Sequence, residues 1–419
     1  MAFEASLEFA EKLDEKDPLR KFRKQFYFPS HKGKKAIYFC GNSLGLQPKL
    51  AARAIRQELK DWKNMAVAGY IGAKNPWLFY QDNFKQPLSK IMGCRQEEIT
   101  VMNALTVNLH LLLLSFYKPA AGRYKIIMEA GAFPSDQYAA ETQVKFHGYD
   151  PKDAIIEIIP RKAEKTLRTE DIIQTIENNK ENIALVLLGG INYYTGQLYD
   201  IQSITAAAHA AGALAGYDLA HAAGNVPLEL HKWNADFAVW CSYKYLNAGP
   251  GAAGGVYIHA KYANDKNYGR LGGWWGNAEK TRFKMEKGFK PKAGAGGWQI
   301  STAQVFNMVA LKASLQLFEK AGIRNIRKKS IRLTGYLEFL LRQLPHIHFE
   351  ILTPADSLQR GAQLSLYFKQ HAKAIHQKLT GNGIVVDYRE PGVIRVAPAP
   401  LYNSFKDVYR FYEILKAFE

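Results

Sequence analysis

From about residue 80 to residue 217, the sequence alternates between short apolar runs and longer stretches in which apolar residues recur at helical spacing. The short runs are typical of strands buried on both faces, and the longer stretches are typical of amphipathic helices. This alternation predicts an α/β fold in which helices cover a mostly parallel sheet. The expected strands are 99–102, 125–128, 155–159, 183–188 and 214–217, and the expected helices are 82–92, 106–116, 135–146, 169–177 and 201–211.

Less regular elements surround this region. Before it, we expect a helix over 5–16, a strand at 35–40 and a helix opened by Pro48. After it, we expect a strand at 255–258, then a long helical segment over 299–344 that leads into a smaller α+β unit. The strands expected in that unit are 349–352, 363–368, 385–388 and 393–396, and its helices are 372–379 and 405–418. The domains expected are 61–300 (large), 301–419 (small, α+β) and an N-terminal segment, 1–60, that packs with the small domain.

The composition narrows the classes of protein to consider. No apolar run is long enough to cross a bilayer, and the N-terminus has no apolar signal core, so we expect a cytoplasmic protein with no membrane partner. Cys40, Cys94 and Cys241 are widely spaced, which favours reduced thiols and no metal site. The net charge of +18 is spread along the chain without a nucleic-acid-binding module, so we expect no nucleic-acid partner and a mild attraction for anionic small molecules.

A single lysine, Lys244, stands among apolar, aromatic and small residues in the segment 241–251. Because burial disfavours the charged form of an amine, a lysine in such a site is a good nucleophile toward a carbonyl group. The commonest carbonyl cofactor is pyridoxal phosphate (PLP), which forms a Schiff base with lysine. The alternative is a lysine with a buried stem whose charged end reaches solvent.

Asp218 strengthens the cofactor interpretation. It follows the apolar run 213–217 and is followed by a small-residue turn that carries His221. A carboxylate at the carboxyl end of a buried strand is costly unless it has a cationic partner. The protonated pyridine nitrogen of PLP is such a partner. The alternative is a cap on a helix that starts near Leu219.

Other turns after strands could line the same site. The helix expected after Asn103 offers free N–H groups that suit a phosphate, and Thr106 could cap that helix. Phe133 could stack on a planar ring or join the core, and Asp136 could be a plain helix-start acid. Two tyrosines, Tyr193 and Tyr194, lie in the turn 190–196.

Two further segments carry polar groups that a substrate could use. Arg395 lies within the apolar strand 393–396 and needs an anion. Bidentate capture of a substrate carboxylate fits the guanidinium, and a structural salt bridge is the alternative. Asn42 and Ser43 either stabilise a turn or form the polar edge of a pocket.

Long and specific segments identify the chain as a member of the kynureninase family, which are PLP enzymes of the aminotransferase fold (fold type I). The segments that carry the resemblance are 39–48, 102–110, 132–136, 194–197, 218–222, 241–249, 281–285 and 395–405. They run through nearly the whole chain. The resemblance implies a large domain with a mostly parallel sheet and a smaller α+β domain.

The resemblance also implies roles for individual residues. Lys244 would carry PLP, Asp218 would pair with the pyridine nitrogen, and Arg395 would hold the substrate α-carboxylate. The other implied cofactor-binding residues are Leu105, Thr106, Phe133, Ser135, Asp136, His221, Tyr243, Trp274 and Thr302, and the other implied substrate-binding residues are Tyr70, Asn42 and Ser43. The family's site lies at a homodimer interface, so Trp274 of the partner subunit and Thr302 of the partner subunit would complete it.

Three positions depart from the animal members of the family. Thr302 stands where they carry Asn, and Tyr70 stands near the place where they carry His. Both should lie near the aromatic ring of the substrate, and they favour kynurenine over its 3-hydroxy derivative. Gly189 replaces a Ser near the phosphate, which removes one hydrogen bond.

The implied reaction is hydrolytic cleavage of the Cβ–Cγ bond of L-kynurenine to anthranilate and L-alanine, in tryptophan catabolism or NAD biosynthesis. Lys244 would remove the Cα proton, and Tyr194 is the hypothesis for activation of the water. A rival is a cysteine desulfurase, which needs an exposed reactive cysteine, whereas all three cysteines lie in or beside apolar segments. A nucleic-acid-binding protein with a vestigial enzyme fold is a second rival.

Overall fold

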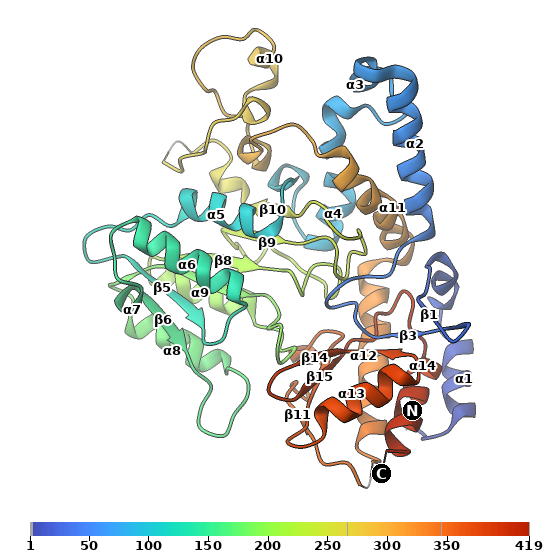
Figure 1. Cartoon of the computed structure of the whole chain (residues 1–419). Coiled ribbons are helices and arrows are strands. Elements are labelled where there is room, and N and C mark those ends of the chain that lie inside the picture. The colour runs from blue at the N-terminus through green and yellow to red at the C-terminus, as the bar shows by residue number, and fades with distance from the viewer. Residues whose placement is uncertain (1–2, 266, 345, 419) are drawn as a thin grey trace.

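The predicted alternation of strands and helices forms one seven-stranded sheet in the order β4-β10-β9-β8-β7-β5-β6. In the computed structural model, which describes residues 3–265, 267–344 and 346–418, this sheet is the centre of the large domain (Figure 1). The strands are β4 (Ile99–Val101), β5 (Lys125–Glu129), β6 (Ile155–Ile158), β7 (Ile183–Gly189), β8 (Leu214–Asp218), β9 (Phe237–Trp240) and β10 (Gly255–Ile258). The pairs from β6 to β9 are parallel, and β10 is antiparallel to both of its neighbours. The prediction of a mostly parallel sheet is confirmed.

Consecutive strand residues enter different cores because side chains alternate across a strand. In β5, Ile126 joins one cluster of buried residues and Ile127 joins the other. The same alternation separates Phe237 from Ala238 in β9. Both faces of the sheet are therefore buried, as the continuous apolar runs predicted. The helices of this domain are α4 (Lys85–Met92), α5 (Leu105–Phe116), α6 (Pro134–Phe146), α7 (Pro151–Ala154), α8 (Thr169–Asn178) and α9 (Ile201–Ala210).

The small domain is built on a four-stranded antiparallel sheet in the order β11-β12-β15-β14. These strands are β11 (Glu350–Ile351), β12 (Leu364–Tyr367), β14 (Asp387–Arg389) and β15 (Val393–Val396). The helices α12 (Ile323–Leu341), α13 (Ala372–Gly381) and α14 (Phe405–Lys416) contribute apolar residues to the core beside this sheet. The α+β prediction for this unit is confirmed.

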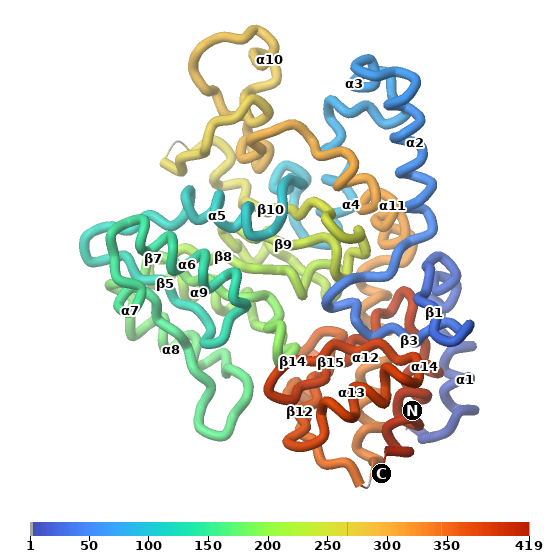
Figure 2. Tube along the Cα trace, in the orientation of Figure 1, coloured from blue at the N-terminus to red at the C-terminus, as the bar shows by residue number. Residues whose placement is uncertain are grey.

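The first part of the N-terminal segment lies against the small domain (Figure 2), whereas its last helix packs on the helix that begins at Val305. Helix α1 (Leu7–Glu15) packs on α14, and β3 (Ile37–Tyr38) pairs in parallel with β13 (Ile384–Val385). The other N-terminal elements are β1 (Ser30–His31), β2 (Lys34–Lys35), α2 (Lys49–Met65) and α3 (Gly69–Gly72). The strand expected at 35–40 is therefore shorter than predicted.

Some expected elements are wrong in detail. The helix expected over 299–344 is two helices, α11 (Val305–Ala321) and α12, which meet at Gly322 with a φ of 76°. A glycine accommodates this left-handed backbone without steric cost, so the break falls there. Met308 and neighbouring residues of α11 join the larger core, so the packing favours a domain boundary near Gly322 rather than at residue 301. The strand expected at 385–388 is divided between β13 and β14.

The segment after β10 runs out from the large domain as a long excursion that includes the short helix α10 (Glu279–Arg282) (Figure 1). Among the described residues, none of the helices is both long and apolar enough to span a membrane.

Candidate active site

Lys244 lies in the turn that follows β9, and only 9 % of it is exposed. Its Nζ is 3.0 Å from Nε2 of the buried His221 and 5.7 Å from the centre of the Phe133 ring. Burial, together with the charges of Lys244, Arg395 and Arg389, holds the pKa of His221 well below its usual range. A neutral His221 can therefore accept a hydrogen bond from the lysine. The alternative of a lysine that reaches solvent is wrong, because the amine end is enclosed.

Two carboxyl groups face Lys244 from neighbouring elements. Asp218 ends β8, and its Oδ1 accepts a hydrogen bond from the Ala220 N–H at 2.6 Å. No helix follows at Leu219 in the described chain, so the helix-cap alternative is wrong, although the side chain does close the turn. Asp136 lies in the first turn of α6, next to Asp218.

The pKa values of these two groups rise together. Burial raises the pKa of Asp218, and Lys244 opposes that rise. Burial and the Asp218 charge raise the pKa of Asp136 well above its usual range. A proton on Asp136 would let it donate a hydrogen bond to Asp218, which favours the carboxylate form of Asp218.

A third buried carboxyl group, Glu129, was missed by the sequence reasoning. It is the last residue of β5, and both of its carboxyl oxygens lie 3.2 Å from the Gly189 N–H. Burial raises its pKa to about 7. The sequence did contain a sign of it: Glu129 is a carboxylate that directly follows the expected strand 125–128, just as Asp218 directly follows the expected strand 214–217. Gly189, at the end of β7, brings its backbone to this carboxyl group.

The start of α5 lines the same cavity as Lys244, with Leu105 and Thr106. The N-cap residue is Ala104, so the prediction of a Thr106 N-cap is wrong. An alanine side chain cannot satisfy the first N–H groups of the helix, which leaves the Leu105 and Thr106 N–H groups available to an anion. The Tyr243 side chain lines the same cavity.

One cavity unites most of the predicted cofactor residues. It is lined by Leu105, Thr106, Glu129, Phe133, Ser135, Asp136, Gly189, Ile191, Tyr193, Asp218, Ala220, His221, Tyr243 and Lys244. Trp274 and Thr302 are not among its lining residues. Trp274 is 46 % exposed, and its Nε1 donates to the Arg282 carbonyl at 3.1 Å.

These residues fit PLP group by group. An enclosed lysine amine suits its aldehyde, a carboxylate beside a protonated carboxyl suits its pyridinium nitrogen, and an exposed aromatic face at Phe133 suits its ring. Within the described chain, the buried Oδ1 of Asp136 has no hydrogen-bond partner, as expected of a site that another group completes.

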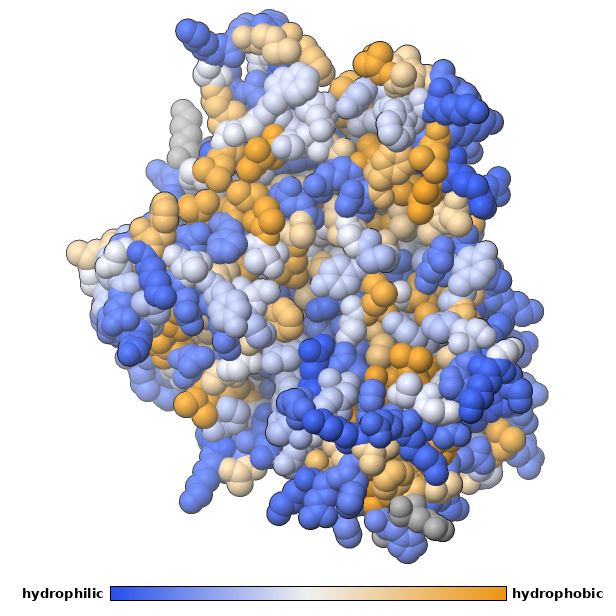
Figure 3. Space-filling view, in the orientation of Figure 1, coloured by the Kyte–Doolittle hydropathy of each residue, from blue (hydrophilic) through white to orange (hydrophobic). Residues whose placement is uncertain are grey.

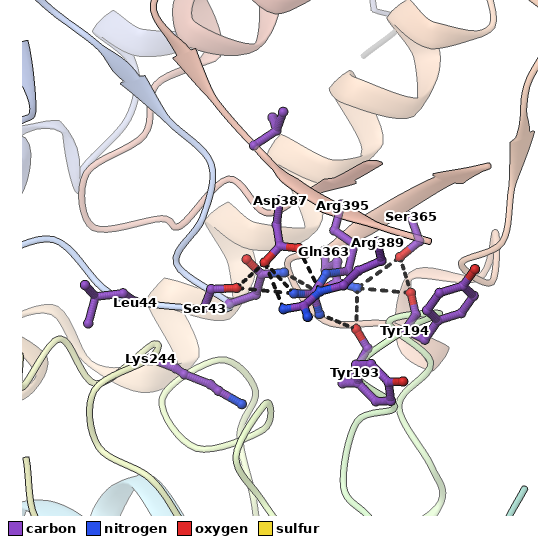
Figure 4. Close-up of polar contacts among 12 residues, drawn as sticks. Ser43, Leu44, Tyr193, Tyr194, Lys244, Gln363, Ser365, Asp387, Arg389 and Arg395 are labelled. Atoms are coloured by element: carbon purple, nitrogen blue, oxygen red, sulfur yellow. Dashed lines mark hydrogen bonds and ion pairs between the residues drawn. The ribbon is translucent and has the colours of Figure 1, made fainter. Parts of the chain in front are cut away.

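Arg395, from β15 of the small domain, lies across from Lys244 (Figure 4). Only 1 % of it is exposed, and its Nη1 donates to the Tyr193 carbonyl at 2.7 Å. Its Nη2 donates to Asp387 Oδ2 at 2.6 Å and to Ser43 Oγ at 3.2 Å. The salt-bridge alternative is therefore correct for the protein alone, while the position of Arg395 also suits a substrate carboxylate.

The other predicted substrate residues are placed differently. Asn42 is buried and donates through Nδ2 to Gln363 Oε1 at 2.7 Å. Tyr70 is 40 % exposed and packs edge-on against Trp77, with ring centres 5.8 Å apart. The Tyr194 residue lines a neighbouring cavity of about 270 Å³, which the Lys244 cavity touches through Tyr193. Burial raises the pKa of Tyr194, so its phenol is a proton donor at neutral pH.

The fold is that of the fold-type I PLP-dependent enzymes. A solved structure of C-DES with glycine covalently linked to the PLP cofactor matches 92 % of this chain and 97 % of its own, with a TM-score of 0.75 and 19 % identity. The apo cysteine desulfurase from Thermococcus onnurineus NA1 matches 97 % of each chain, with a TM-score of 0.74 and 18 % identity. At these identities the likeness shows the fold alone.

The sequence comparisons identify the family. The kynureninase of Flavobacterium psychrophilum is 52 % identical over 419 residues, which cover 99 % of this chain and 99 % of that protein. The family model for the kynureninase C-terminal domain matches residues 326–415. The chain belongs to the kynureninase family.

Proposed function

We propose that this protein is a PLP-dependent kynureninase that hydrolyses the Cβ–Cγ bond of L-kynurenine to give anthranilate and L-alanine. The observation that carries the proposal is the enclosed Lys244 amine, with Asp218 beside it and Arg395 across from it, in a chain that belongs to the kynureninase family. The reaction would serve tryptophan catabolism or NAD biosynthesis.

Lys244 is the residue that would hold PLP and then move a proton. When bound, PLP would act as an electron sink for the negative charge that develops on the substrate. Once the substrate amine has displaced it, the free Lys244 amine is the base for the substrate Cα proton. His221 Nε2, 3.0 Å away, orients this amine and accepts its hydrogen bond.

The paired carboxyl groups keep one negative charge beside the pyridine nitrogen. The Asp136 proton stabilises the ionised form of Asp218 through their hydrogen bond. Glu129 has a pKa of about 7, so at neutral pH it is only partly ionised and adds little further charge. Asp218 is therefore the carboxylate that would hold a protonated ring nitrogen.

Arg395 and Ser43 would bind the substrate at its amino-acid end. Both side chains lie on the small-domain side of the site, and Tyr193 joins them to the large domain through its carbonyl (Figure 4). Asn42 would support this end, since its buried amide fixes Gln363 beside Tyr193.

Tyr194 would act on the water that adds to the substrate ketone. Its raised pKa favours a protonated phenol, which would donate to the carbonyl oxygen or orient the water. A Tyr194→Phe variant tests this role: kcat should fall about 10-fold or more, and an unchanged kcat would remove Tyr194 from the mechanism.

The three cysteines do not suit the desulfurase alternative. Cys40 and Cys241 are buried and Cys94 is half-buried. Burial raises the pKa of Cys40 to about 12 and also raises the pKa of Cys94 and Cys241. Buried thiols with raised pKa values form little thiolate, which is the nucleophile that desulfurase chemistry needs. Free thiols also fit the reducing cytoplasm, where we place the protein.

We also propose a homodimer in which a second copy of the chain completes each site. Large apolar side chains are exposed along α2 and α3, among them Trp62 (58 %) and Ile71 (78 %), and Met285 (72 %) is exposed on the α10 excursion. Figure 3 shows apolar side chains gathered at the upper right, over α2 and α3, and below the α10 loop. Exposed apolar surface on this scale suits a partner subunit. The expected contributions are Trp274 of the partner subunit and Thr302 of the partner subunit.

The experiment that tests the function compares two substrates. The PLP-loaded protein is mixed with L-kynurenine or with 3-hydroxy-L-kynurenine, and the aromatic acid and alanine released are quantified. We expect equal amounts of anthranilate and L-alanine, formed faster from kynurenine, as Tyr70 and Thr302 favour. Faster reaction of the hydroxylated substrate would keep the function and discard that preference, whereas no release from either substrate would contradict the function.

A further inference from the structure

The guanidinium of Arg395 has few N–H groups left for a substrate. Its Nη2 donates to Asp387 and to Ser43, whose Oγ also donates to Asp387, and its Nη1 donates to the Tyr193 carbonyl. Nε is buried and has no partner in the described part of the chain. Both Nη atoms of Arg395 therefore already have acceptors in the protein, and a carboxylate that binds Arg395 would compete with them.

A second arginine shares the same carboxylate. Arg389 donates to Asp387 from Nε at 2.9 Å and from Nη2 at 3.2 Å. Asp387 and Arg389 are two positions apart on β14, so their side chains lie on one face of the sheet. Arg395 stands directly opposite Asp387 in the antiparallel β14–β15 pair. The sheet register thus brings two guanidinium groups to one carboxylate.

Arg389 is linked to the active site through Asp387, the carboxylate that it shares with Arg395. Its charge contributes to the lowered pKa of His221, the residue that holds Lys244. The Arg389 side chain is 43 % exposed, and its Nη1 makes no hydrogen bond with the described residues. Figure 4 shows Arg389 and Arg395 grouped around Asp387 on the side that faces Lys244 in this view.

The balance of charge shows what this arrangement can hold. Arg395 with Asp387 alone is neutral, so a substrate carboxylate bound there would leave one buried negative charge without a partner. With Arg389 included, two guanidinium groups and one carboxylate leave one positive charge in excess. A single monoanionic carboxylate neutralises that excess, and buried charges are tolerated only when they are paired.

We propose that Arg389 is a second substrate-binding cation, and that Asp387 orients Arg389 and Arg395 into a two-arginine clamp for the α-carboxylate of the amino-acid substrate. This inference rests on the proposed function, because that function supplies the carboxylate. It assigns discrimination between a free amino acid and its uncharged amide to Arg389. Because Arg389 is exposed, an incoming substrate would contact it before it reaches Arg395.

The test measures how each variant distinguishes a carboxylate from a carboxamide. Arg389→Met and wild type are loaded with PLP and assayed with L-kynurenine and with L-kynurenine amide, and the absorbance of the bound cofactor is titrated with L-alanine and with L-alaninamide. In the variant, we expect the KM for L-kynurenine and the Kd for L-alanine to rise about 10- to 100-fold, since a hydrogen bond to a charged group contributes that much. We expect kcat to change less than about threefold, and the values for both amides to stay the same.

Two further variants separate this role from a structural one. Arg389→Lys keeps the charge and should recover part of the lost affinity for L-alanine. Lys373→Met removes a neighbouring surface charge that pairs with the exposed Glu390, and should leave every constant unchanged. If Arg389→Met distinguishes acid from amide as well as wild type does, the proposal is wrong. If wild type releases no anthranilate, the proposed function fails, and the alanine titration still decides whether Arg389 binds a carboxylate.

Discussion

The cofactor half of the active site and its carboxylate half differ in how far the protein alone satisfies their polar groups. The cofactor half, made of Lys244, His221, Asp218, Asp136 and Glu129, holds three buried carboxyl groups around one amine, and the pKa of each carboxyl group is raised. The protein alone leaves an excess of acid there, which a bound cation would relieve.

In the carboxylate half, made of Arg395, Arg389, Asp387, Ser43 and the Tyr193 carbonyl, the one carboxylate is already paired with two guanidinium groups. Burial alone would raise the pKa of Asp387, but Arg395, Ser43 and Arg389 bring it below the usual range. The contrast indicates that the first half is built around a group the chain does not contain. The second half is rigid before substrate arrives, so it can hold the substrate in one orientation.

The largest expected effect tests the cofactor half. Lys244→Ala removes both the group that would bind PLP and the base for the Cα proton, so kcat for anthranilate release should fall about 10⁴-fold. The variant should still fold, because Lys244 lines the cavity and belongs to none of the hydrophobic cores of the described chain. Release at the wild-type rate by Lys244→Ala would remove the lysine from the mechanism.

The next effect tests the pairing in the carboxylate half. Asp387→Asn leaves the buried Arg395 without its counter-charge, so the free energy of unfolding should fall by about 3–5 kcal/mol. Glu390→Gln is the matched control, since Glu390 is exposed and its loss should leave the free energy of unfolding almost unchanged. Urea unfolding of both variants measures the difference. Equal stability of the two variants would show that Asp387 does not hold the cluster together.

A third prediction uses the pH dependence of stability to test the cofactor half of the active site. Because the pKa of Glu129 is about 7 in the folded protein and near 4.5 ordinarily, the folded state binds more protons between these values. The stability of the cofactor-free protein should therefore fall as pH rises through this window, by ~3 kcal/mol from Glu129 alone.

Glu129→Gln, which cannot ionise, is the comparison for this pH effect. Its stability should decline less than that of wild type between about pH 4 and about pH 8. The decline should not vanish, because the raised pKa values of Asp136 and Asp218 act in the same direction. If the stability of wild type and of the variant changed with pH in the same way, burial would not raise the pKa of Glu129.

The smallest expected effect concerns the aromatic end of the substrate. Thr302→Asn should shift the ratio of kcat/KM values toward 3-hydroxy-L-kynurenine by about 3- to 10-fold, the effect of one neutral hydrogen bond. Tyr70→Phe, which keeps the ring and removes only the hydroxyl, tests the second of these positions and should change the ratio less. A ratio unaffected by Thr302→Asn would place that residue away from the substrate.

Much of the fold followed from the sequence because strand and helix periodicities are local. Strands β7 and β8 begin where the apolar runs predicted, and the parallel arrangement follows from the helices between them. Lys244 and Asp218 were found because a charged residue at the end of an apolar run is unusual. Glu129 had the same signature, since it directly follows the expected strand 125–128, and it was overlooked.

The carboxylate half could not be derived in the same way. The contact between Asp387 and Arg395 depends on the register of two antiparallel strands, which neither strand specifies by itself. Arg389 then gains its position only through Asp387. The parts expected from Trp274 and Thr302 depend on a second subunit, and an intramolecular pattern carries no information on that contact.

The most direct test of the account is to find where PLP becomes attached. The protein is loaded with PLP, reduced with borohydride to fix any Schiff base, digested, and mapped by mass spectrometry, while thermal unfolding is followed in parallel. The account predicts one phosphopyridoxyl group per chain, on Lys244, and a higher Tm for the loaded protein because the cofactor binds the folded state. Attachment at another lysine, or loading that leaves both Lys244 and the Tm unchanged, would contradict it.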